Sequence, residues 1–148
     1  MRPDDVTPDV IEPNVPATGE TSWFCCGAAW GPCGSTNKGA CGTCNSGSRQ
    51  CAWPNASAAC FSITRPDQCG EDLLRWGCGH RFFVRNLCGT TEISVTIADC
   101  GPHTNFWCGE RSCCGGSCAS NRILDLTPSA FSAIGNLSSG LMPMAVHS

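Results

Sequence analysis

The sequence has no tyrosine, a single lysine (Lys38) and only 14% charged residues. Its 9 basic and 12 acidic side chains give a formal net charge of −3. The basic residues form no stripe that could follow a phosphate backbone, so nucleic acid is not an expected partner. No window approaches the roughly 18 consecutive apolar residues of a membrane-spanning helix, so we expect no membrane segment.

A secretory leader is also missing from the start of the chain, which is acidic and rich in proline through residues 1–22. Three explanations fit the lack of a leader: a mature or trimmed form, a misplaced gene start, or an unusual export route. We favour the first two, because a reducing cytosol would leave the cysteines as unpaired thiols.

Cysteine is what the sequence has in excess, with 15 in 148 residues. This content is typical of disulfide scaffolds in exported proteins, and the length suits one domain. Because the number is odd, at most seven bridges form within the chain, and one sulfur stays free or pairs elsewhere. Most of the following are predicted to form disulfides: Cys25, Cys26, Cys33, Cys41, Cys44, Cys51, Cys60, Cys69, Cys78, Cys88, Cys100, Cys108, Cys113, Cys114 and Cys118.

The spacing of these cysteines raises the possibility of metal binding. Cys41 and Cys44 form a C-x-x-C pair, which fits half a zinc site or a redox pair. No second such pair stands at zinc-ribbon distance, and the three histidines are scattered. We therefore predict structural bridges, with no metal and no cofactor. Adjacent cysteines seldom bond to each other, so each should reach a different loop.

The chain divides into three parts. Residues 1–22 predict a flexible acidic, proline-rich tail, because they carry too few apolar side chains to offset chain entropy. Residues 23–70 have short spacings of Gly, Ser, Asn and Pro between cysteines and predict loops tied by sulfur. The rest is more regular, so residues 23–148 are expected to form one cysteine-rich domain.

The regular part predicts a small β-barrel with one short helix. Residues 81–87 and 92–98 alternate as two antiparallel strands. Thr127 suits a helix N-cap, Pro128 the first helical position and Gly135 the end, with a hydrophobic staple between Leu126 and Phe131. Residues 142–146 predict a closing strand in which Pro143 takes an edge or outward position.

The strand "ISVTIADCGP" (93–102) runs into an acid. Strict alternation would place Asp99 on the same buried face as Ile93, Val95 and Ile97. An acid there has three explanations. It is catalytic, with its pKa raised by burial, or an Asx-turn residue that ends the strand by accepting from the backbone near Gly101, or a residue already turned out to solvent.

Four stretches, "HRFFVRN", "ISVTIADCGP", "NRILDLTPSAFSAIGNLSSGLMPMAV" and "GACG", together resemble the double-psi β-barrel superfamily. This group includes rare lipoprotein A-like domains, barwin, kiwellin-type proteins, the first domain of expansins and related endoglucanases. The resemblance covers residues 69–147 and the GACG stretch (39–42). It implies a mainly β fold, a six-stranded double-psi barrel with one or two short helices and long disulfide-tied loops.

The resemblance also implies candidate catalytic residues. In the lipoprotein A-like transglycosylases an aspartate stands at the position of Asp99, and another, matching Asp125, precedes the last helix. The related endoglucanases carry a catalytic base just before an early Cys-Cys pair, where this chain has Phe24. Expansins have histidine and phenylalanine before the acid, where this chain has Ile123 and Leu124.

Each candidate residue also has a structural explanation. Asp125 is either a proton donor or an acid favoured near the start of a helix by its free N–H groups. His103, Asn105 and Trp107 follow the Asp99 turn and would give a sugar an aromatic platform with polar groups. Alternatively, Trp107 packs against nearby disulfides.

Three functions remain open at this point. The leading hypothesis is a secreted, monomeric expansin-like or barwin-like protein that binds or loosens cell-wall polysaccharide or peptidoglycan without ordinary hydrolysis. The second is a glycan-cleaving enzyme, endoglucanase-like or lytic transglycosylase-like, that uses Asp99 and Asp125. The third is a defence or protease-inhibitor protein whose surface loops act.

Overall fold

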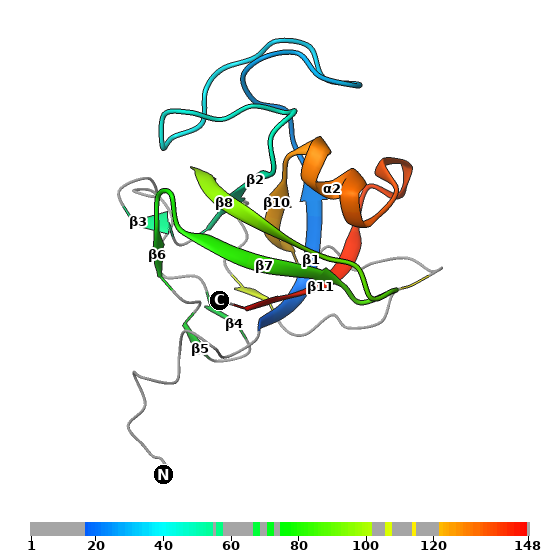
Figure 1. Cartoon of the computed structure of the whole chain (residues 1–148). Coiled ribbons are helices and arrows are strands. Elements are labelled where there is room, and N and C mark those ends of the chain that lie inside the picture. Colours follow the sequence, from blue (N-terminus) through cyan, green and yellow to red (C-terminus); the bar gives the residue numbers. More distant parts are fainter. Residues whose placement is uncertain are drawn as a thin grey trace.

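Six strands close into a barrel in the computed structural model, which describes residues 17–54, 56–57, 67–68, 71–72, 75–101, 106–107, 114 and 122–147 (Figure 1). The order around the barrel is β1-β10-β2-β8-β7-β11. The strands are β1 (Ala17–Trp23), β2 (Gln50–Trp53), β7 (Arg81–Asn86), β8 (Glu92–Cys100), β10 (Arg122–Leu126) and β11 (Met142–His147). The predicted mainly β barrel is confirmed.

Within the barrel, two strand pairings are parallel, β1 with β10 and β2 with β8, and the other four are antiparallel. Parallel neighbours cannot be joined by a tight turn, so long connections must cross an end of the barrel. Short strands lie in two further sheets. In one, β3 (Ala56–Ser57) pairs with β6 (Trp76–Gly77), and in the other β4 (Asp67–Gln68) pairs with β5 (Glu71–Asp72) and β9 (Phe106–Trp107).

The hairpin of β7 and β8 follows the alternation of its sequence. Phe82 and Val84 of β7 face the core with Ile93 and Val95 of β8, and each is at most 7% exposed. The intervening β7 residues are exposed. Because one face is buried in the core and the other is exposed, the pairing register is strongly specified. This confirms the two predicted antiparallel strands.

Helix α2 (Pro128–Ile134) also forms where its capping signals predict it. The Thr127 hydroxyl accepts a hydrogen bond from the Ala130 N–H at 3.4 Å, and the Gly135 N–H donates to the Phe131 carbonyl at 2.8 Å. Phe131 is fully buried in the barrel core together with Leu126, as the staple requires. A 3₁₀ helix, η2 (Leu137–Ser139), follows and is the second short helix.

The barrel begins earlier than the sequence indicates. β1 starts at Ala17, so residues 17–22, predicted as tail, belong to the barrel. These residues are mostly small and polar, and they are held by backbone pairing with both β10 and β11. Gly19 fits because a side chain there would press on Ile123. Composition alone does not reveal such a strand. Residues 1–16 lie outside the described part.

The edge position predicted for Pro143 is wrong, because β1 and β7 flank β11. Pro143 alternates with the inward-facing Met142 and Met144, so it takes the outward alternative, and it is buried there. Pro143 pairs with Glu20 of β1, whereas the pairing with β7 runs only from Met144 onward. The missing N–H therefore falls at the beginning of the strand, where it interrupts little of the ladder. The alternating Met142, Met144 and Val146 face the core as predicted.

Four disulfides join described residues: Cys25–Cys33, Cys26–Cys44, Cys41–Cys78 and Cys88–Cys114. Cys100 is also disulfide-bonded. Adjacent Cys25 and Cys26 bond to different partners, which confirms that expectation. Cys60, Cys69, Cys108, Cys113 and Cys118 lie outside the described residues. Among the described cysteines, Cys51 of β2 is free and buried.

Candidate functional site

Strand register brings the two candidate acids into one row on the outer face of the barrel. Ser22 of β1 is in register with Asp125 of β10, Asp125 with Ala52 of β2, and Ala52 with Asp99 of β8. Residues directly opposite on paired strands share a face of the sheet. We call these four residues the carboxylate row.

The side chains next to the carboxylate row along the strands point into the barrel, which shows that the row itself points outward. Leu126, Cys51 and Ile97 are in register across β10, β2 and β8, and all are at most 1% exposed. Along a strand successive side chains alternate between faces. The adjacent Asp125 and Ala52 are therefore directed to the outside of the barrel.

Asp99 reaches the outer face through an irregularity in β8. Cys51 pairs with Ile97, but the next β2 residue, Ala52, pairs with Asp99, so Ala98 is skipped. An extra residue of this β-bulge type shifts all later side chains to the opposite face. Strict alternation, which would place Asp99 with Ile93 and Val95 inside, is therefore wrong. Ala98 is buried, and Asp99 is partly exposed.

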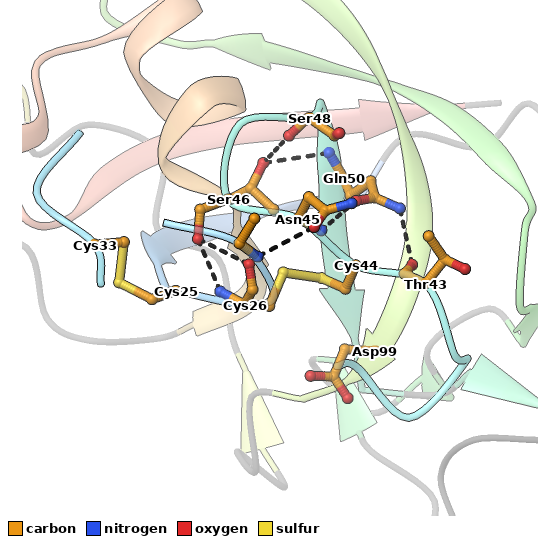
Figure 2. The surroundings of a disulfide bond; sticks show 12 residues. Cys25, Cys26, Cys33, Thr43, Cys44, Asn45, Ser46, Ser48, Gln50 and Asp99 are labelled. Atoms are coloured by element: carbon orange, nitrogen blue, oxygen red, sulfur yellow. Dashed lines mark hydrogen bonds between the residues drawn. A yellow bond between two sulfur atoms is a disulfide. The ribbon is translucent and has the colours of Figure 1, made fainter. Parts of the chain in front are cut away.

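One oxygen of the Asp99 carboxylate holds the GACG loop (residues 39–42). Its Oδ1 accepts hydrogen bonds from the Ala40 N–H and the Cys100 N–H, both at 2.8 Å. The Cys41 N–H donates to the Ala98 carbonyl at 3.0 Å. Figure 2 shows Asp99 on the side of Thr43 and Cys44 away from Ser46 and Ser48. The predicted Asx-turn contact near Gly101 is replaced by these bonds.

Gly39 allows this close approach of loop and strand. A Cβ at position 39 would meet the Ala98 carbonyl oxygen, and it would lie 3.1 Å from the Asp99 Cβ. Two disulfides also hold this region, because Cys41 within the loop is bonded to Cys78, and Cys44, two residues after the loop, to Cys26. The C-x-x-C sulfurs are thus used in structural bridges, as predicted.

Asp125 is more affected by burial than Asp99 is. The Ser22 hydroxyl donates a hydrogen bond to its Oδ1 at 2.9 Å, and Arg122 Nη1 donates to the Ser22 Oγ at 2.9 Å. The pKa of Asp125 is raised to about 6, chiefly by burial and to a smaller extent by the negative charge of Asp99, while the Ser22 hydrogen bond and Arg122 lower it. A carboxyl group with this pKa is partly protonated near neutral pH and can donate or accept a hydrogen bond.

The two carboxyl groups are separated by one strand. Adjacent strands lie about 4.8 Å apart, so the Cα atoms of Asp99 and Asp125 are roughly 10 Å apart across Ala52. Ala52 contributes only a methyl group between them and is 3% exposed. The row therefore places two acids on either side of a small, buried residue.

Phe24 stands next to this row and directly follows β1. Its backbone N–H donates to the Leu126 carbonyl at 2.9 Å. Its half-buried ring packs against the cluster formed by Cys26, Cys44 and Ala98. An apolar side chain thus occupies the position where the resemblance would place a catalytic base.

The structure does not describe the side chains of the remaining predicted sugar-binding residues. His103 and Asn105 lie outside the described residues, and for Trp107 only the backbone in β9 is described. Ser22, Arg122 and Ala40 join the site although the sequence does not single them out. Their roles depend on register and loop position, for which no local pattern exists. In the described part of the chain, no cluster of metal-ligating side chains and no helix long and apolar enough to cross a membrane is found.

The topology now identifies the fold. A closed six-stranded barrel holds two parallel pairings, each between strands distant in sequence. The fold is a double-psi β-barrel. No protein-family model matches the sequence, and no curated protein matches it significantly.

Two solved structures resemble this double-psi barrel. The Streptomyces papain inhibitor is 19% identical with a TM-score of 0.49, covering 90% of this chain and 96% of its own. A variant of the Clavibacter michiganensis expansin in complex with cellohexaose is 16% identical with a TM-score of 0.45, covering 89% of this chain. The chain spans 49% of that expansin. At these identities the likeness concerns the fold, and no residue role is transferred.

Proposed function

We propose that this protein is secreted and binds cell-wall polysaccharide through the carboxylate row without ordinary hydrolysis. The observation that carries the proposal is the unequal state of the two acids. Asp125 has a pKa of about 6 and lies on the outer face, whereas Asp99 uses Oδ1 to hold the GACG loop.

Inverting hydrolysis needs a second carboxylate that is free to activate a water molecule opposite the acid. The Asp99 carboxylate is oriented by two backbone N–H groups, and Phe24 offers only a ring. Asp125, by contrast, can exchange hydrogen bonds with sugar hydroxyl groups as either donor or acceptor. This chemistry supports recognition more than bond cleavage.

Secretion is supported by the disulfides. Four bridges join described residues, and such bridges persist in oxidising compartments outside the cytosol. The cell wall is such a location. Cellulose is the first polysaccharide to test, because the similar Clavibacter expansin is described with cellohexaose.

The test is a pull-down with insoluble cellulose, chitin and peptidoglycan, combined with assays for released reducing ends and anhydro-sugars. We expect binding to at least one of them and no release above background. Asp125→Leu should weaken binding about threefold to tenfold through loss of a hydrogen bond to the sugar. Ser132→Ala, which removes an exposed hydroxyl group on helix α2, serves as the control.

Two results would contradict this proposal. Failure to bind all three polysaccharides would exclude the binding function. Product release by the wild type that Asp125→Asn abolishes would instead establish the glycan-cleaving enzyme.

A second candidate function, protease inhibition, is favoured by one exposed loop. Residues 28–32 and 34–38 are exposed, and the bridges Cys25–Cys33 and Cys26–Cys44 tie this segment down. Trp30, 38% exposed, exchanges two backbone hydrogen bonds with Cys33 at 2.9 and 2.8 Å. A preordered loop loses little entropy when it enters a protease cleft.

Inhibition should then survive Asp99→Asn and Asp125→Asn but fall with Trp30→Ala. Papain is the first protease to assay, given the name of the similar Streptomyces protein. The absence of inhibition across a panel of cysteine and serine proteases would exclude this candidate.

A further inference from the structure

The outer face of β7 carries a basic and aromatic stripe. Arg81, Phe83 and Arg85 alternate with the buried Phe82 and Val84 and are exposed. Phe83 is 40% exposed, the highest exposure among the large apolar side chains in the described part of the chain. At about 3.3 Å per residue, the two arginine Cα atoms lie roughly 13 Å apart along the strand.

Neighbouring strands hold the aromatic ring in place. His147 of β11 is in register with Phe83, and the two rings stack with centroids 5.2 Å apart at an interplanar angle of 21°. Glu92 of β8 also holds the imidazole, since its Oε1 lies 3.1 Å from His147 Nε2. The Phe83 ring is therefore an oriented platform on the surface.

A pocket of about 320 Å³ opens beside one end of the stripe. Thr96 of β8, which lines the pocket, is directly opposite Arg81 of β7. Both are on the outer face, because Val95, Ile97 and Phe82 point into the core. The lining residues are Cys41, Thr43, Gln50, Cys78, Gly79, Thr96 and Ile97.

The Cys41–Cys78 disulfide gives this pocket a covalently fixed wall. The Gln50 side chain is committed to the loop, because its Nε2 donates to the Thr43 carbonyl at 3.0 Å and its Oε1 accepts from the Asn45 N–H at 2.8 Å. Thr43 and Thr96 add hydroxyl groups that can donate and accept. The pocket thus combines a rigid wall with polar groups suited to a sugar ring.

We propose that the β7 stripe and this pocket form a docking surface for an acidic polysaccharide, one that carries uronic-acid carboxylates. Phe83 stacks on the apolar face of a sugar ring, and Arg81 and Arg85 each pair with a carboxylate. A neighbouring sugar lies in the pocket against Thr96. The surface extends the proposed polysaccharide binding to charged chains and uses no residue of the carboxylate row.

Charge complementarity decides between the possible occupants. Arginine binds planar carboxylates through paired N–H groups, and the aromatic platform favours a ring. The surface offers two arginines and an acidic neighbour, Glu92, in a chain of net charge −3. That is too little positive charge for a nucleic-acid backbone, whereas it matches the sparser carboxylates of an acidic glycan.

The experiment measures binding to polygalacturonate, with dextran as the neutral comparison. Arg81→Gln and Arg85→Gln should each weaken polygalacturonate binding about twofold to fivefold, and Phe83→Ser about twofold to tenfold. Salt should weaken the wild-type interaction, because exposed charges are screened. Lys38→Gln removes one exposed positive charge elsewhere and should change nothing.

The outcomes also separate this proposal from the preceding one. Asp125→Leu should leave polygalacturonate binding unchanged even where it weakens binding to insoluble polysaccharide. Loss of binding in Asp125→Leu but not in the arginine variants would overturn the β7 surface. Three further results would overturn the proposal. They are a loss of polygalacturonate binding in Lys38→Gln equal to that in the arginine variants, tighter binding to polyuridylate than to polygalacturonate, and self-association that Phe83→Ser abolishes.

Discussion

At the scale of single residues, Asp125 is the group whose environment is most at odds with its charge. Its pKa of about 6 means that the folded protein favours the neutral carboxylic acid, whereas the unfolded chain ionises near pH 4. Its contribution to stability is therefore present below about pH 4 and is lost as pH rises to about 6. The loss amounts to about 3 kcal/mol.

Asp125→Asn should therefore be more stable than the wild type at pH 8, by up to about 3 kcal/mol, and of similar stability at pH 3.5. The amide oxygen can still accept the Ser22 hydroxyl proton. Urea unfolding of both proteins at the two pH values measures the difference. A difference that does not vary with pH would contradict the assigned environment.

Cys51 is a residue whose chemistry is suppressed by its position. Its side chain is fully buried, and burial together with the charge of Asp125 raises the pKa of the thiol well above its usual value. Reaction requires the thiolate and access to it. Iodoacetamide at pH 8 should leave Cys51 unmodified in the folded protein and alkylate it in 6 M guanidinium, as read by peptide mapping. Alkylation at Cys51 in the native state would contradict this.

At the scale of elements, the docking of the GACG loop on β8 depends on a glycine. Gly39→Ala places a methyl group against the Ala98 carbonyl and Asp99, so we expect a loss of about 1–3 kcal/mol in the free energy of unfolding. Gly34→Ala is the matched control, because nothing lies within 4 Å of its added Cβ. That control should change stability by less than about 0.5 kcal/mol. Equal effects would mean that the loop does not depend on this close approach.

At the scale of the whole molecule, a disulfide that closes a longer loop reduces the conformational entropy of the unfolded chain more, and so stabilises the fold more. Cys41–Cys78 closes 37 residues and Cys25–Cys33 closes 8. Replacing both cysteines of the first pair with alanine should cost about 4 kcal/mol, against about 2.5 kcal/mol for the second. Thermal and denaturant unfolding of the two double variants provides the comparison. A larger loss for the Cys25–Cys33 pair would contradict this order.

The sequence by itself determined the features that depend on local periodicity and capping. Alternation predicted the strands of the β7–β8 hairpin, and Thr127, Pro128 and Gly135 predicted helix α2, because each signal lies within a few residues of its effect. The resemblance carried by scattered short motifs also predicted the barrel type and the two candidate acids.

The tertiary structure decided what depends on contacts between distant segments. Skipping Ala98 turned Asp99 outward, and register placed Ser22 and Arg122 around Asp125. The disulfide pairings and the polar strand β1 are likewise set by which segments meet when the barrel closes. Local sequence does not encode these relations, since a shift of one residue in register exchanges the inner and outer faces of a strand.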